Sequence, residues 1–172
     1  MSVKPQDVVV LLKIAKCKGS RPPYAKIADE LFMSPSQVHA SVKRAQAAHL
    51  LHGPELGERV NVTALQEFLV HGLKYVFPPR QGGQARGLPT SYAADPLSEK
   101  IARSDDLIPV WPCAEGVQGY AFEPLYKKAP EAAKRDPELR ELLVLVDALR
   151  AGRVRERKLA EQELSNRLRS VS

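Results

Sequence analysis

Apolar residues recur at helical spacing in two neighbouring stretches near the N-terminus. In residues 23–32, Ile27, Ala28 and Leu31 share one face, which predicts a short amphipathic helix. A second helix is predicted from residue 35 onward, because apolar residues again return about once per turn. Its buried face would consist of Val38, Val42, Ala45 and, at its end, Leu50.

The link between these two helices, Met33-Ser34-Pro35, suits a tight turn. Ser34 is a favourable N-cap, because its hydroxyl can accept a hydrogen bond from a free N–H of the first helical turn. Pro35 suits the first helical position, where no N–H donor is needed.

The exposed face of the second helix is polar and basic. It carries Ser36, Gln37, Ala40, Lys43 and Arg44, and none of its exposed positions between 36 and 44 is acidic. A short helix, a tight turn and a polar second helix are the layout of a helix-turn-helix. The second helix of that motif lies in the DNA major groove, with its N-terminal residues at the base edges.

This segment resembles the helix-turn-helix of bacterial winged-helix transcription regulators, including MarR-like proteins. The residues that carry the resemblance are Ile27-Ala28, Leu31, Met33-Ser34-Pro35-Ser36, Val38-His39, Val42-Lys43-Arg44 and Leu50-Leu51. The resemblance implies a winged helix confined to the N-terminal part of the chain. Residues 51–62 either form a small wing, without the Asp-x-Arg pattern of MarR-like wings, or a solvated turn.

A DNA-binding helix-turn-helix assigns roles to eight residues. Those expected to face the bases are Ser36, Gln37, Ala40 and Lys43, and those expected at the backbone are Ser34, His39, Arg44 and Arg59. Gln37 can pair with adenine, and Lys43 or Arg44 can reach guanine or phosphate. Winged helices also serve as protein-interaction modules, which is the alternative interpretation of the same pattern.

Two further helices are predicted around this motif. Residues 5–18 form a helix that packs beneath the helix-turn-helix, and residues 63–76 form another, capped by Thr63. The apolar stripe of the latter is Leu65, Phe68, Leu69, Leu73 and Val76.

The middle of the chain has no clear helical period. Residues 77–103 are rich in Gly, Pro and small polar residues, and the basic run 80–87 is interpreted as a mobile loop in preference to an arm that reaches DNA. Around residues 114–116 a hairpin of two short strands is possible. The aromatic residues nearby fill a small second core or form a docking patch: Trp111, Tyr120, Phe122 and Tyr126.

The C-terminal part predicts two helices. Asp136 and Pro137 start the first, whose wide apolar strip includes Leu139, Leu142 and Leu149, and the last spans residues 153–169. We expect dimerisation through these helices. A basic cluster marks the bend between them and is either solvated or bound to DNA or an acidic partner: Arg150, Arg153, Arg155, Arg157 and Lys158.

Composition and charge reduce the number of functional classes to consider. The net charge of +6 favours a polyanionic partner, and the two cysteines have no metal-ligand spacing, which fits a reduced, cytoplasmic compartment. No signal peptide and no membrane-spanning stretch is recognised. No catalytic constellation, nucleotide loop or metal motif is present, so we expect no enzyme, no cofactor and no metal.

The sequence therefore predicts a mainly α protein. Residues 1–76 form a winged helix-turn-helix, residues 77–130 a loop-rich connection with a small second core, and residues 131–172 the C-terminal helices. The expected function is a sequence-specific double-stranded DNA-binding transcription regulator, a repressor acting as a homodimer. The alternative is an antitoxin-like or adaptor protein whose C-terminal half binds a partner protein.

Overall fold

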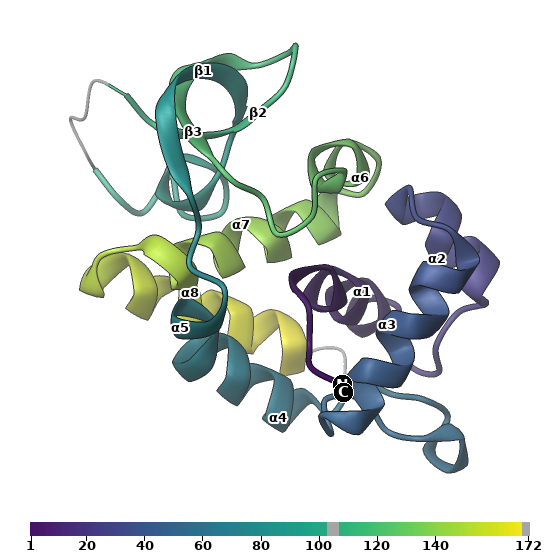
Figure 1. The fold of residues 1–172 in the computed structure, drawn as a ribbon. Helices are drawn as coiled ribbons and strands as arrows, with labels where there is room; N and C mark the ends of the chain where they lie inside the picture. The colour runs from purple at the N-terminus through teal and green to yellow at the C-terminus, as the bar shows by residue number, and fades with distance from the viewer. Residues whose placement is uncertain (103–106, 170–172) are drawn as a thin grey trace.

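The computed structural model describes residues 1–102 and 107–169, and helix α1 (Pro5–Lys16) lies at the centre of the molecule (Figure 1). A helix that is apolar all round must be covered on every side. The sequence predicts α1 only as a support beneath the helix-turn-helix, but it also packs against α7 (Pro137–Ala151) of the C-terminal part. The buried residues of α1 include Val8, Val9, Val10, Leu11, Leu12, Ile14 and the polar Asp7 and Lys13.

The helix-turn-helix forms as predicted. Helix α2 (Tyr24–Leu31) ends at Phe32, which adopts a left-handed conformation with φ of 58°, and α3 (Pro35–Ala47) starts after the N-cap Ser34. The prediction of the apolar faces is confirmed, and Ser41 of α3 is also buried. The buried residues of the two faces are Ile27, Ala28, Leu31, Val38, Val42, Ala45 and Leu50.

The segment after α3 forms a minimal wing. Leu51 and Val60 form one antiparallel bridge, and the N–H of His52 donates to the carbonyl of Arg59 at 2.8 Å. A short 3-10 turn (Pro54–Leu56) lies at the tip. The chain therefore reverses as a wing does, but the two expected strands are reduced to a single bridged pair.

The next helical stretch runs through α4 (Val62–Glu67), a π-helical turn (Phe68–Gly72) and α5 (Leu73–Val76). Asn61 is its N-cap, since the side chain accepts from Ala64 N at 3.2 Å, and the expected cap at Thr63 is wrong. Of the predicted stripe, Leu65, Leu69 and Leu73 are buried, whereas Val76 is exposed.

The middle of the chain contains a small sheet instead of a loop. Strands β1 (Gln81–Pro89), β2 (Pro109–Pro112) and β3 (Val117–Phe122) close into a barrel, and a short 3-10 turn (Ser91–Ala93) follows β1. Each of β2 and β3 pairs antiparallel with β1, and they pair parallel with each other. The expected hairpin between β2 and β3 is therefore absent from the described residues.

The fold class predicted from the sequence is wrong, because the protein combines α-helices with a mixed β-sheet. Strand β1 comprises residues 81–89 and so includes most of the run 80–87, for which the sequence favours a mobile loop. Its glycines lack the side chains that give strands their alternating pattern. At Gly87 a Cβ atom would lie 1.9 Å from the carbonyl oxygen of Trp111, so the strands approach too closely for a larger residue.

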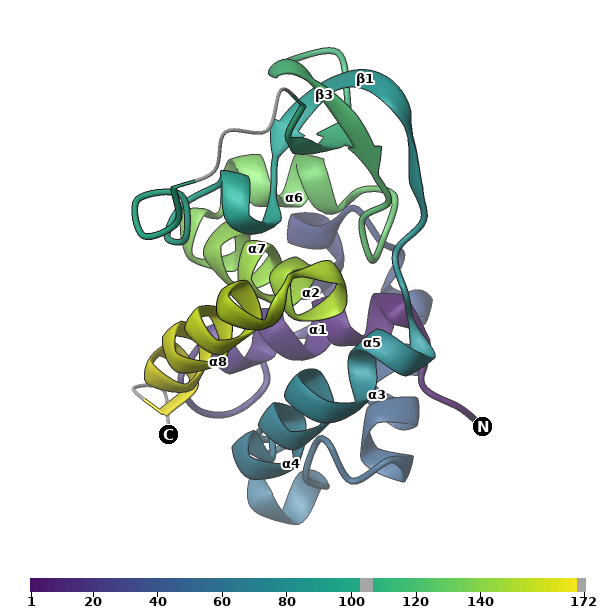
Figure 2. The same ribbon diagram turned by 90° about the vertical axis from the view of Figure 1, so that its left-hand side faces the viewer.

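The C-terminal part begins with α6 (Ala129–Arg135), followed by α7 and α8 (Val154–Arg169). The prediction that Asp136 caps α7 is confirmed, since its carboxylate accepts from Leu139 N at 3.2 Å. Figures 1 and 2 show α7 between the barrel and α1, with α8 beside it. The apolar strip of α7, on which the expectation of a dimer rested, is therefore covered within the chain. Its buried residues are Leu139, Leu142, Leu143, Val144, Leu145, Val146 and Leu149.

A buried acidic residue attaches the barrel to α7. Asp147 accepts hydrogen bonds from the Nε1–H of Trp111 and the hydroxyl of Thr90, both at 2.7 Å, and from Arg150 at 2.9 Å. Arg150 also donates to the carbonyl of Phe77 at 3.0 Å. Arg150 is buried, so it does not belong to the basic surface at the bend between α7 and α8 as the sequence suggested.

Candidate nucleic-acid interface

The start of α3 is fixed by a reciprocal capping box. The N–H of Gln37 donates to the Ser34 hydroxyl at 3.1 Å, and the N–H of Ser34 donates to Oε1 of Gln37 at 2.8 Å. Pro35 occupies the first turn, where its missing N–H costs nothing. Two otherwise free N–H groups are thereby satisfied, and the first turn of α3 is held in one conformation.

Most of the predicted base-contacting residues share the exposed face of α3. Ser36, Gln37 and Lys43 are exposed, and Ala40 is half-buried. Two of the polar groups already have partners: Gln37 Oε1 belongs to the capping box, and Ser36 Oγ lies 3.0 Å from Ser34 Oγ. Gln37 can therefore offer its amide N–H groups and the second lone pair of Oε1 to a base.

Arg44 is not oriented toward the exposed face. Its Nε and Nη2 donate to the two carboxylate oxygens of Asp7 in α1, both at 2.8 Å, and Asp7 is completely buried. The hydrogen bond to Asp7 raises the pKa of the Arg44 guanidinium, although burial opposes this shift. Arg44 therefore fastens α3 to α1 and does not reach phosphate in this arrangement.

His39 takes part in a chain of contacts that joins α3 to the wing. Its ring meets the ring of Tyr24 edge-on, with 5.4 Å between centroids, and the guanidinium of Arg21 lies 3.8 Å from the Tyr24 centroid. Arg21 in turn pairs with Glu58 of the wing at 2.7 Å. These contacts orient the exposed His39 ring. The ion pair with Arg21 also neutralises Glu58, an acidic residue of the wing.

Arg59 lies at the other end of the motif. It is exposed on the wing, next to Val60, which pairs with Leu51 just after the C-terminal end of α3. A helix of this length spans about 20 Å. Arg59 therefore cannot act at the same bases as Gln37, and only a backbone contact at the far end of a groove is geometrically suited to it.

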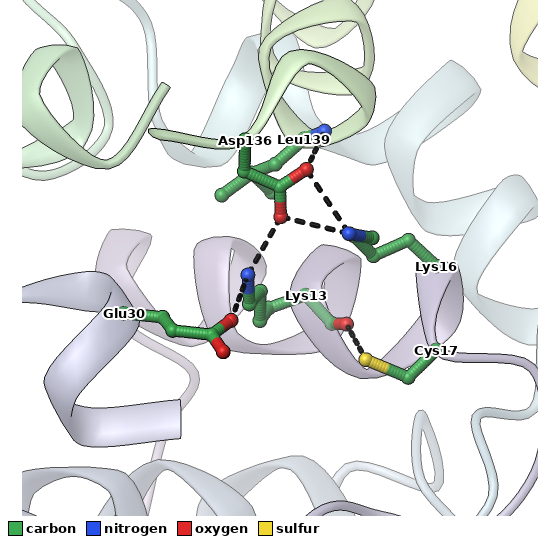
Figure 3. Close-up of polar contacts among 6 residues, drawn as sticks. All are labelled: Lys13, Lys16, Cys17, Glu30, Asp136 and Leu139. Carbon is green, nitrogen blue, oxygen red and sulfur yellow. Dashed lines mark hydrogen bonds and ion pairs between the residues drawn. The ribbon is translucent and has the colours of Figure 1, made fainter. Parts of the chain in front are cut away.

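The structure also fixes the helix-turn-helix to the C-terminal helices through a buried ion network (Figure 3). Lys13 of α1 pairs with Glu30 of α2 and with Asp136 at the start of α7, the latter at 2.6 Å, and Lys16 donates to Asp136 at 2.9 Å. Burial lowers the pKa of Lys13, but the hydrogen bonds that its ammonium donates to Asp136 and Glu30 outweigh this effect and raise the pKa.

The sequence interpretation missed Asp7 and Lys13, although each gives a signal. Both are charged residues within a helix whose other positions are mostly apolar, and such residues need a partner when buried. The identity of the partners depends on contacts between distant segments, such as the 123 residues that separate Lys13 from Asp136.

Neither a metal site nor a similar protein helps to identify the function of this chain. Within residues 1–102 and 107–169, no three His, Cys, Asp or Glu side chains gather as metal ligands would, and no helix is long and apolar enough to cross a bilayer. No family model, no curated protein and no solved structure matches this chain.

Proposed function

We propose that this protein binds double-stranded DNA by placing α3 in the major groove and that it acts as a sequence-specific regulator of transcription. The observation that carries the proposal is the exposed face of α3, whose N-terminal turn is fixed by the capping box. This face presents Ser36, Gln37, Ala40 and Lys43 to a partner and contains no acidic residue. A rigid helix with such a face suits the base edges of the major groove.

The proposed contacts divide into two groups. We assign Ser36 and Gln37 in the first turn of α3, and Lys43 two turns later, to the base edges. Ser34 and His39 flank them and suit the backbone. Phosphate contacts set the register and base contacts set the sequence. The net charge of +6 favours association with a polyanion. Occupation of an operator, as one copy or as a pair, would repress transcription.

Selection from a random duplex pool, performed at two salt concentrations and followed by sequencing, tests the proposal. An enriched motif is expected, palindromic if two copies bind together, and binding should weaken as salt rises. Binding without enrichment would contradict sequence specificity, and no binding at low salt would contradict the whole proposal.

Two substitutions in α3 test which of its residues contact the DNA. Gln37→Ala should relax the preference at one or two positions of the motif, and Lys43→Ala should lower affinity about tenfold. Lys158→Ala, which removes an exposed lysine of α8, is the control and should leave both unchanged. Equal losses for Lys43→Ala and Lys158→Ala would show that α3 has no special role.

A second candidate function is an adaptor whose C-terminal half binds an acidic protein. It is favoured by exposed apolar side chains near the bend between α7 and α8: Tyr75, Val76 and Val154. Arg150 donates to the Phe77 carbonyl and so places the end of α5 beside this bend, where Arg153 and Arg155 are exposed. Copurification of one protein at fixed stoichiometry, lost on Val154→Glu, supports this function, and retention by that variant contradicts it.

A further inference from the structure

The turn of the helix-turn-helix is covered by a segment that lies almost a hundred residues later in the chain. The hydroxyl of Tyr126 donates to the carbonyl of Phe32 at 2.8 Å. The guanidinium of Arg135, the last residue of α6, lies 4.3 Å from the centre of the Phe32 ring. Since Phe32 is followed after one residue by the N-cap of α3, both ends of the segment 126–135 lie close to the start of that helix.

This segment brings positive charge to the turn. Lys127 and Lys128 follow Tyr126 directly and are exposed, as is Arg135. In the part of the chain that the structure describes, none of these three forms an ion pair, whereas Lys134 pairs with Glu115 of the barrel at 3.2 Å. The acidic residue of α2 that faces this side, Glu30, is paired with Lys13. The segment 126–135 also contains the acidic Glu131, so its basic residues outnumber its acidic one.

We infer that Lys127 and Lys128 bind the phosphate backbone of the same duplex that α3 enters, flanking the base-contacting site on the side of the turn. This inference rests on the proposed function. The Tyr126–Phe32 hydrogen bond attaches the segment of the two lysines to the turn that precedes α3, so the fold fixes where these lysines lie relative to the base contacts. Each phosphate that such a lysine neutralises releases a counterion and steepens the dependence of binding on salt.

The test is the salt dependence of duplex binding for two matched double variants. Lys127→Gln/Lys128→Gln removes the proposed contacts, and Arg155→Gln/Lys158→Gln removes the same charge from the exposed surface of α8. Affinity is measured by fluorescence anisotropy between 50 and about 300 mM salt on the duplex enriched from the random pool. All four positions are exposed, so neither variant disturbs the core.

The first variant should reduce the slope of log affinity against log salt by about two and leave the preferred sequence unchanged. The α8 variant should keep the slope of the unmodified protein. An unchanged slope for the first variant, or an equal decrease in both, overturns the inference while leaving DNA binding by α3 intact. Absence of salt-dependent binding by the unmodified protein instead overturns the proposed function, and the inference with it.

Discussion

Arg44 of α3 and Asp7 of α1 form a two-bond ion pair in which the carboxylate has no exposure to solvent. The Asp7 carboxylate also accepts from the N–H of Lys4 at 2.8 Å and so caps its own helix. The pair therefore joins the proposed DNA-reading helix to the centre of the core. Arg44, which the sequence predicts as a phosphate contact, therefore has a structural role.

Asp7→Ala should destabilise the protein by about 3–5 kcal/mol, because it leaves the largely buried guanidinium of Arg44 without its partner. The free energy of unfolding is obtained from urea titration followed by circular dichroism. Asp29→Ala, which removes an exposed acidic residue of α2, should change stability by less than about 0.5 kcal/mol. The double variant Asp7→Ala/Arg44→Ala should cost less than the sum of the single changes, and strict additivity would contradict a direct pairing.

The ion network at the junction of α1 and α7 predicts a dependence of stability on pH. Burial disfavours the charged form of Asp136, but hydrogen bonds from Lys13, Lys16 and the Leu139 N–H outweigh it and hold its pKa below the ordinary value of about 3.9. Protonation therefore favours the unfolded chain. The contribution of Asp136 is present above about pH 4 and is lost as the pH falls through the pKa of the folded state.

Asp136→Asn isolates this charge, because asparagine can still serve as an N-cap. At neutral pH the variant should be less stable by about 2 kcal/mol, and the difference from the unmodified protein should shrink as the pH falls from 5 to about 2. Urea titrations at several pH values measure it. Asp29→Asn, which removes an exposed carboxylate of α2, is the matched control. A difference that stays constant across this range would mean that the pKa of Asp136 is the same in the folded and the unfolded chain.

The helix-turn-helix was predictable from the sequence because its signals are local. The spacing of Ile27, Ala28 and Leu31, and the cap Ser34-Pro35, lie within a few residues of the structure they determine. The barrel was not predictable, because β1 is rich in glycine and its partners lie more than twenty residues away. The exposed face of α3 was assigned correctly in part, but Arg44 was not, since its partner is 37 residues distant.

Asp147 of α7 attaches the barrel to the helices, and its removal should lower the free energy of unfolding. Asp147→Ala leaves Arg150 buried without an acidic partner and removes the acceptor of the Trp111 Nε1–H. We expect a loss of about 3–5 kcal/mol in the free energy of unfolding, measured by urea titration with circular dichroism. Trp111→Phe keeps an aromatic side chain but removes the Nε1–H donor and part of the buried volume, and because it leaves Asp147 and Arg150 paired it should cost less than Asp147→Ala. Equal costs would indicate that the packing of Trp111, not the polar cluster, attaches the barrel.

Gly87 of β1 should tolerate no side chain. A Cβ there would lie 1.9 Å from the carbonyl oxygen of Trp111 and 2.6 Å from its carbon, both of which belong to the backbone of β2. Gly87→Ala must therefore push β1 away from β2 and cost about 1–3 kcal/mol or more. The emission of Trp111, the only tryptophan, should shift to longer wavelength as solvent reaches it.

Gly83→Ala is the matched control in the same strand, because a Cβ at that position meets no atom within 4 Å. It should change stability by less than about 0.5 kcal/mol and leave the Trp111 emission unchanged. Identical effects of the two substitutions would show that β1 does not pair with β2 in solution. A selective effect at Gly87 would establish that the glycine-rich run is a strand of the folded barrel, because a mobile loop would accept an alanine equally well at either position.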